Sequence, residues 1–167
     1  MNESYAEAGV KRDKTIGSYV AKFFIIFAVL VVIFIGGPMF GSIAIMIGSV
    51  AAFLCASMFP RFNIEYEYIY CDGQLDFDRI TGNAKRKNML RIDSDSIEMI
   101  APVNSHALDN YKNVKVIVKD FSSKRPDANV FAIISHNQKD VLKILFEPNE
   151  KMIACIKQKT PRKISEI

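Results

Sequence analysis

The sequence predicts a membrane protein of the α+β class. It should have an N-terminal hairpin of two transmembrane helices, followed by a domain of seven antiparallel strands closed by a C-terminal helix. Residues 23–60 contain no Asp, Glu, Lys or Arg, which predicts the hairpin. After position 61, apolar residues recur at every second position, and after position 150 their period becomes that of a helix. The expected elements therefore follow one another as two apolar helices, seven strands and one amphipathic helix.

The charge-free stretch is too long for one membrane span and about right for two. A helix needs about 20 apolar residues to cross a hydrocarbon core of about 30 Å. Gly36-Gly37-Pro38 divide the stretch, because Pro lacks a helical N–H and Gly supplies the unusual φ of a tight reversal. We therefore expect a hairpin at residues 19–60 with spans at 19–36 and 39–59. Residues 1–18 form the segment before it.

Basic residues predict the orientation of this hairpin. Because Lys and Arg near helix ends favour the cytoplasmic side, we expect a multi-pass protein of the cell membrane with both termini in the cytoplasm. The residues that carry this argument are Lys11, Arg12, Lys14, Lys22 and Arg61. Two alternatives stay open: a cleaved signal peptide, whose apolar core has the length of Phe23–Ile35, and a hairpin buried in a soluble protein. Met1-Asn2 lacks the N-myristoylation signal.

The remainder of the chain has the size and composition of one soluble domain. Residues 61–167 carry 18 Lys and Arg against 15 Asp and Glu, a net charge of +3. This mixed surface argues against nucleic acid as a partner, which would require a dense basic stripe. The three cysteines, Cys55, Cys71 and Cys155, are too scattered for a disulfide framework or a metal clip.

Alternating apolar residues predict the strands of this domain. Asp72-Gly73 and Thr81-Gly82-Asn83 provide turns between the first three strands, and Asn104–Asn113 is expected to be a loop. His136–Lys139 should form the last turn. The expected strands are Phe62–Tyr70, Leu75–Phe77 with its flanks, Lys85–Ile92, Ile97–Val103, Val114–Val118, Val130–Ser135 and Val141–Phe146.

A C-terminal helix should follow the strands. Met152, Cys155 and Ile156 are spaced as the apolar stripe of an amphipathic helix. Pro148 is suited to the start of this helix, and Pro161 ends it. We therefore expect a domain at residues 61–160 and a tail at 161–167.

This order of elements resembles the pleckstrin-homology-like (PH-like) barrel, and the whole chain resembles membrane-anchored bacterial PH-like proteins. It is also similar to small two-pass membrane proteins of a domain-of-unknown-function family. The residues that carry the resemblance are Tyr66–Phe77, Lys85-Arg86-Lys87 and Ile97–Ile100. The resemblance implies a seven-stranded PH-like β-barrel capped by a helix. A small open barrel or a sandwich stays open as a competing arrangement.

A basic strand is the candidate contact for anionic lipid or a partner. It consists of Lys85, Arg86, Lys87 and Arg91. The resemblance implies such a role, because PH domains often bind phosphoinositide headgroups with basic residues of early hairpins. Alternation places Arg86 on the face opposite the other three residues. The alternative is a solvated strand whose basic residues pair with Asp76 and Asp78.

No motif predicts catalysis, a cofactor or a metal. Phosphate-binding loops, HExxH and GxSxG are absent from the sequence. His106 and His136 fall in an expected loop and turn, and turn or strand patterns explain the pairs Asp76/Asp78 and Asp93/Asp95. We therefore expect a non-enzyme that presents a binding or scaffolding domain. The alternatives are an anionic-lipid-sensing module and an accessory subunit or homo-oligomer in the lipid bilayer.

Overall fold

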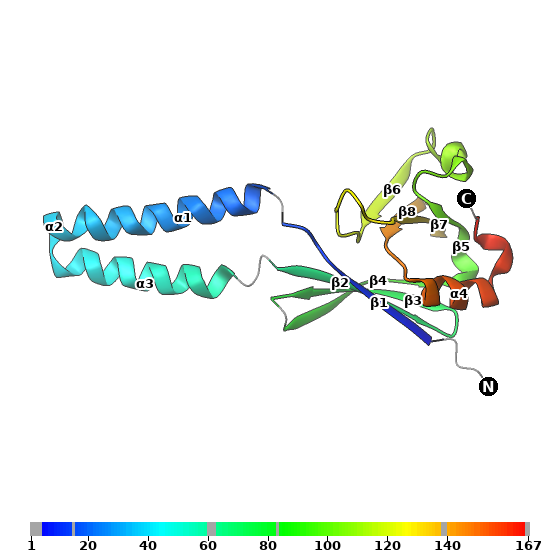
Figure 1. The fold of residues 1–167 in the computed structure, drawn as a ribbon, viewed down its shortest axis with the longest axis horizontal. Coiled ribbons are helices and arrows are strands. Elements are labelled where there is room, and N and C mark those ends of the chain that lie inside the picture. The colour runs from blue at the N-terminus through cyan, green and yellow to red at the C-terminus, as the bar shows by residue number, and fades with distance from the viewer. Residues whose placement is uncertain (1–4, 15, 60–62, 83, 138–139, 166–167) are drawn as a thin grey trace. The chain divides into compact units, whose positions relative to one another are not determined.

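The computed structural model describes residues 5–14, 16–59, 63–82, 84–137 and 140–165 (Figure 1). The chain divides into two compact units. The helical unit contains residues 13–64 and 81–84, and the β unit contains residues 1–12, 65–80 and 85–167. Arg61, which contributes to the orientation argument, lies outside the described residues.

Three helices make up most of the helical unit: α1 (Ile16–Phe34), α2 (Gly36–Phe40) and α3 (Ser42–Met58). The expected break at residues 36–38 is a short helix, because Pro38 lies in the first turn, where a helix needs no N–H donor. The chain instead leaves α2 at Gly41, whose φ of +66° favours glycine.

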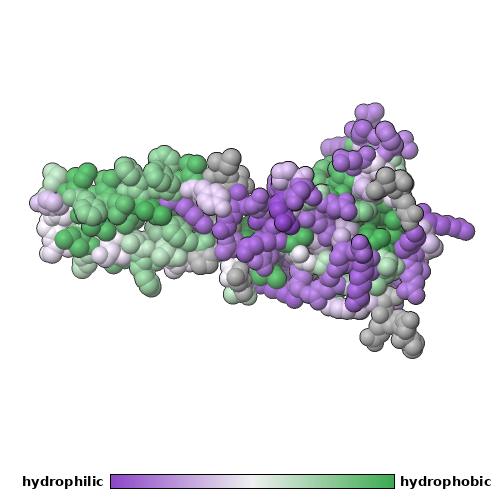
Figure 2. Space-filling model, in the orientation of Figure 1, coloured by the Kyte–Doolittle hydropathy of each residue, from purple (hydrophilic) through white to green (hydrophobic). Residues whose placement is uncertain are grey.

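α1 and α3 pack closely and expose large apolar side chains. A Cβ atom on Gly48 would lie 2.5 Å from Cγ1 of Ile33, so the close approach requires a glycine. Figure 2 shows hydrophobic surface over these helices. Phe23, Phe34 and Phe53 are among their exposed side chains. Among the described residues, one stretch, Tyr19–Phe40, has the length and composition of a membrane span, and the apolar helix at Ser42–Ser57 is shorter.

The β unit contains two four-stranded sheets and no closed barrel within its described residues. The first sheet has the order β1-β2-β3-β4 and the second β5-β7-β8-β6. Their strands are β1 (Tyr5–Lys11), β2 (Ile64–Cys71), β3 (Gln74–Thr81), β4 (Lys85–Asp93), β5 (Ile97–Pro102), β6 (Val116–Asp120), β7 (Phe131–Asn137) and β8 (Asp140–Phe146).

The expected seven-stranded antiparallel barrel is therefore wrong in three respects, and the first is that the described strands form two sheets instead of a closed barrel. The domain has an eighth strand, β1, and β6 pairs with β8 in parallel, from Val116↔Val141 to Asp120↔Leu145. Alternation along a strand tells which residues share a face, but it does not tell which strand lies beside it. A short 3₁₀ helix, Ser94–Ser96, connects the two sheets between β4 and β5.

β1 moves the start of the β unit from the expected residue 61 to the N-terminal side of the hairpin. It pairs with β2 in antiparallel register, from Tyr5↔Cys71 to Lys11↔Glu65. The sequence of residues 1–18 gives only a weak strand pattern, because the side chains that point inward from β1, such as Ala6, are small. Its partner also lies more than 50 residues away, on the other side of the apolar stretch.

The core of the β unit is an aromatic cluster between the two sheets. The ring of Phe77 stacks on Phe121 with centroids 4.9 Å apart and meets Tyr68 and Phe146 edge-on. The hydroxyl of Tyr68 donates to the carbonyl of Phe121 at 2.5 Å, which satisfies its buried polar group. A second cluster around Leu108 packs beneath the 3₁₀ helix His106–Tyr111, where the sequence predicts a loop.

The expected C-terminal helix is confirmed as α4 (Glu150–Lys159). The Asn149 side chain caps it by accepting from the backbone N–H of Met152 at 2.8 Å, and Met152 and Ile156 are fully buried. α4 packs on β1, where the Asn149 amide donates to the carbonyl of Glu7. The tail covers β5, because Ser165 N–H donates to the carbonyl of Ile100.

Candidate functional site

Both arginines of the basic strand bind carboxylates of neighbouring strands. Nε of Arg86 lies 2.5 Å from Asp78, and its Nη2 lies 2.8 Å from Glu67. The hydrogen bond to Asp78 raises the pKa of Arg86. Arg91 binds both carboxylate oxygens of Asp76, at 2.6 and 2.8 Å, in the bidentate geometry that favours Arg over Lys. These pairs correspond to the alternative in which the basic residues pair within the sheet.

The contacts leave two lysines as the free cations of this strand. Alternation predicts that Arg86 and Arg91 lie on opposite faces of the strand. Their carboxylate partners, Asp78 and Asp76, lie two positions apart on β3 and therefore share a face, so the two arginines reach the same face of the sheet. Lys85 and Lys87 are exposed, and neither has a bonding partner in the described part of the chain. Contact of the basic strand with lipid or a partner stays a prediction that rests on these two lysines.

A carboxyl pair lies beside Arg86 where β1 meets β2. The Glu67 carboxyl group donates a hydrogen bond to Glu7, and this bond together with partial burial raises the pKa of Glu67. The same hydrogen bond, together with one from Tyr5, lowers the pKa of Glu7. One proton shared between two adjacent carboxyl groups explains the opposite shifts.

Replacing Glu7 with Gln is expected to lower the pKa of Glu67. The amide of the introduced Gln can donate to ionised Glu67, and the substitution removes the neighbouring Glu7 carboxylate. Both changes favour the charged form of Glu67. NMR titration of the Glu67 carboxyl group measures this shift. E65Q is the control, because Glu65 pairs with Lys11 instead. An unchanged or higher pKa of Glu67 in E7Q would contradict the shared proton.

The two carboxyl groups should also influence stability with opposite signs. Because its folded pKa is raised, Glu67 contributes stability below its unfolded pKa, and this contribution is lost as pH rises through the folded value. Glu7 has a lowered folded pKa, so its contribution is present above its unfolded pKa and is lost as pH falls. E7Q should therefore change the pH dependence of unfolding mainly in the acidic range.

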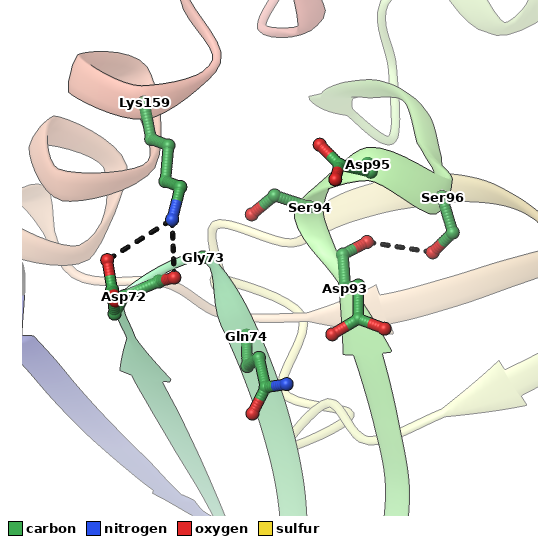
Figure 3. Close-up of a pocket in the computed structure, with 8 residues that line it drawn as sticks. All are labelled: Asp72, Gly73, Gln74, Asp93, Ser94, Asp95, Ser96 and Lys159. Atoms are coloured by element: carbon green, nitrogen blue, oxygen red, sulfur yellow. Dashed lines mark hydrogen bonds and ion pairs between the residues drawn. The ribbon is translucent and has the colours of Figure 1, made fainter.

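A polar pocket of about 340 Å³ lies where the β2–β3 turn, the β4–β5 connection and the end of α4 meet (Figure 3). The backbone N–H of Ser94 donates to the carbonyl of Gly73 at 2.7 Å and holds the turn against the connection. The lining residues are Asp72, Gly73, Gln74, Asp93, Ser94, Asp95, Ser96 and Lys159.

Gly73 allows Lys159 to lie across the turn. Its φ is +93°, and a Cβ atom there would lie 2.5 Å from Nζ of Lys159. Nζ donates to the carbonyl of Asp72 at 2.5 Å and to its carboxylate at 3.2 Å. A second lysine, Lys163, donates to the carbonyls of Ser94 and Asp95 from outside the lining. The pocket therefore already holds one ammonium group of the chain itself.

The lining is acidic, with three carboxylates and one ammonium group. Lys159 pairs with Asp72, whereas Asp93 and Asp95 have no ion pair in the part of the chain that the structure describes. The carboxylates stand apart in Figure 3, and the described residues hold no group of three His, Cys, Asp or Glu that could hold a metal ion. This geometry favours a ligand with several separated donors.

The two histidines lie in surface contacts of the β unit. His136 belongs to β7 and not to the expected turn, part of which lies outside the described residues, and its Nε2 lies 2.5 Å from Glu98. Hydrogen bonds from Tyr111 and then His136 lower the pKa of Glu98. Burial and the bond to Glu98 raise the pKa of Tyr111 to about 12. His106 is exposed and lies 3.2 Å from Asp109.

The model of a protein family described as a bacterial PH-like domain (DUF6106) matches residues 2–166. The chain belongs to this family. The match includes β1, the helical unit and α4, so the PH-like family unit contains α1, α2 and α3 and does not begin after them. No curated protein and no solved structure matches the chain.

Sequence reasoning about this PH-like domain found the parts of the pocket separately. Asp72-Gly73 is predicted as a turn and Asp93/Asp95 as a pair, while Lys159 lies in the expected C-terminal helix. Nothing in the sequence brings them together, because the contact joins residues up to 87 positions apart. Ser94 carries no sequence signal. Ser122, Ser123 and Ser135 are buried as well, and the Oγ of Ser94, which is unpaired within the described part of the chain, distinguishes it from these three serines.

Proposed function

We propose that this chain is a two-pass integral membrane protein that presents its PH-like domain at the cytoplasmic face as a binding and scaffolding module. Pairing of β1 with β2 is the observation that carries the proposal. Hydrogen-bonded neighbours in one sheet lie on the same side of a membrane. The segment between them must therefore cross an even number of times, although only one of its two apolar stretches has the full length of a span.

The dimensions of the helices support two crossings. α1 has 19 residues and α3 has 17, which correspond to lengths of about 28 and 26 Å at 1.5 Å per residue. Both approach the hydrocarbon thickness of about 30 Å, and a shorter span is tolerated by local thinning of the bilayer. Lys11, Arg12, Lys14 and Lys22 favour a cytoplasmic start of α1.

Labelling of single cysteines in intact cells tests the two-pass topology. In a C55S/C155S background, the exposed Cys71 of the PH-like domain should react with a membrane-impermeant maleimide only after permeabilisation. A cysteine in place of Met39, in α2, should react in intact cells. Labelling of both positions from the same side would overturn the two-pass proposal.

Protein binding is a better explanation of the domain surface than lipid sensing. Arg86 and Arg91 are neutralised within the sheet, so the basic strand offers two lysines, each worth about 1 kcal/mol near an anionic leaflet. β6 ends the second sheet and exposes the apolar side chains of Ile117 and Val118. An edge of this kind can pair with an extended strand of a partner protein.

A pull-down of the full-length protein in mild detergent, with mass spectrometry of the bound proteins, tests the binding role. We expect one stoichiometric partner, and we expect V118E to lose it because Val118 is 53% exposed on β6. M89E is the matched control, since Met89 is 40% exposed on the opposite sheet's edge strand, β4.

Retention of the partner by V118E would contradict the role of the β6 edge. Recovery with lipid alone would instead favour the lipid-sensing alternative. In that case, loss of lipid in K85A/K87A would identify the basic strand as the contact.

A further inference from the structure

We propose that the pocket at the Asp72-Gly73 turn is a binding site for a primary ammonium group, supplied by a lysine side chain of a partner or by a free polyamine. This inference names the chemistry of a ligand for the proposed binding role. Binding of a partner's lysine rests on that proposed function. Binding of a free polyamine does not depend on that role.

A buried hydroxyl without a partner points to a missing ligand. Ser94 is 3% exposed, and its Oγ has no hydrogen-bond partner among the described residues. Figure 3 shows this side chain pointing into the pocket, toward the side where Lys159 lies. Leaving a buried hydroxyl unpaired is costly, so a group that donates to Oγ would be held strongly there.

The charge of the pocket selects the class of that group. The three aspartates of the lining outnumber Lys159 and the adjacent Lys163 together, so an anion would meet net repulsion and a cation net attraction. An ammonium group has three donors and no acceptor, and can therefore bond to the Ser94 hydroxyl and to separated carboxylate and carbonyl oxygens. A volume of about 340 Å³ lies within the range of small-ligand pockets.

Lys159 provides an internal example of the same chemistry. Its ammonium group already binds the carbonyl and carboxylate of Asp72 at one end of the pocket. The ammonium group of the ligand would bind beside the Lys159 ammonium group, at Ser94 and Asp95, or would replace it. Lys159 repels or competes with the incoming cation in either case, so its removal should strengthen binding.

Titration of the full-length protein in detergent micelles with two probes tests the site. The probes are spermidine and an acetylated, amidated pentapeptide with one central lysine, and the readout is the backbone NMR shift of Gly73 and Ser94 together with calorimetry. We expect both residues to shift. Loss of one charge-assisted hydrogen bond in S94A or D95N should weaken binding about tenfold. K159Q should strengthen it.

Matched variants separate the site from general charge effects. D127N changes the net charge as D95N does, and K151Q changes it as K159Q does. Both positions are exposed and lie outside the lining, so both variants should bind like the wild type. The same peptide with a trimethylated lysine, which keeps the charge but has no donor, should bind at least tenfold more weakly. Thermal melts of every variant verify that it folds. The NMR shifts of Gly73 and Ser94 in the wild type test the site even where a variant does not fold.

Binding of spermidine alone identifies a polyamine source, and binding of the peptide alone identifies a partner lysine. Absence of shifts at Gly73 and Ser94 with both probes would overturn the proposal. Wild-type affinity in S94A and D95N would also overturn it, as would equal affinity of the wild type for the trimethylated and the unmodified peptide. None of these outcomes affects cysteine labelling or the V118E pull-down, so failure of the site is distinguishable from failure of the proposed function.

Discussion

Deletion of residues 1–12 is expected to abolish cooperative folding of the β unit, although these residues precede the hairpin. β1 provides the edge of the first sheet next to β2, with seven paired residues in register. It also carries α4, because Asn149 and Cys155 donate to the carbonyls of Glu7 and Tyr5. Loss of β1 would expose the apolar face of α4 and the unpaired edge of β2.

A joined chain provides the matched comparison for this deletion. Lys11 and Glu65 are opposite each other in the sheet, so residues 5–11 can be connected to 65–167 by a short Asn- and Gly-containing turn. We expect this chain to unfold in one cooperative thermal transition by circular dichroism. The fragment 65–167 alone should lack such a transition. Equal melting of both chains would show that β1 is dispensable.

Replacement of Phe77 with Ala should destabilise the β unit by about 3–5 kcal/mol, the range for truncation of a buried Phe. Phe77 is fully buried and contacts Phe121, Tyr68 and Phe146, so its loss leaves a cavity in the aromatic cluster between the sheets. Urea unfolding of the joined chain measures the free energy.

F77L should be less destabilising than F77A, because Leu fills part of the cavity. M89A, at a half-exposed position of β4, should stay within about 0.5 kcal/mol of the unmodified chain. A change of less than 1 kcal/mol in F77A would contradict the position of Phe77 at the centre of the core.

The elements predicted most accurately depend on local signals. α4 follows from the spacing of Met152, Cys155 and Ile156, from Pro148 before its start and from Pro161 after its end, whereas its Asn149 cap is seen only in the structure. The β2–β3 hairpin follows from alternation on both sides of Asp72-Gly73. In both cases the residues that determine the structure are within a few positions of one another, and the chain needs no distant partner to reveal them.

The basic strand illustrates an intermediate case. Pairing of Arg86 with Asp78 and of Arg91 with Asp76 is one of the two interpretations that the sequence allows, because the residues face each other across one hairpin. The contact of Arg86 with Glu67 requires the position of β2 beside β3 as well. Strand order therefore decided how much positive charge remains available on this surface.

By itself, the sequence determined the apolar helices, most strands of the domain, the C-terminal helix and the basic strand, because periodicity and charge are local properties. The tertiary structure alone decided that β1 belongs to the β unit, that the strands form two sheets with β6 parallel to β8, and that Ser94 is buried beside Asp72 and Lys159. These features depend on pairing between residues far apart in the chain. Such pairing is selected by the packing of the whole core, to which each short segment contributes only a part.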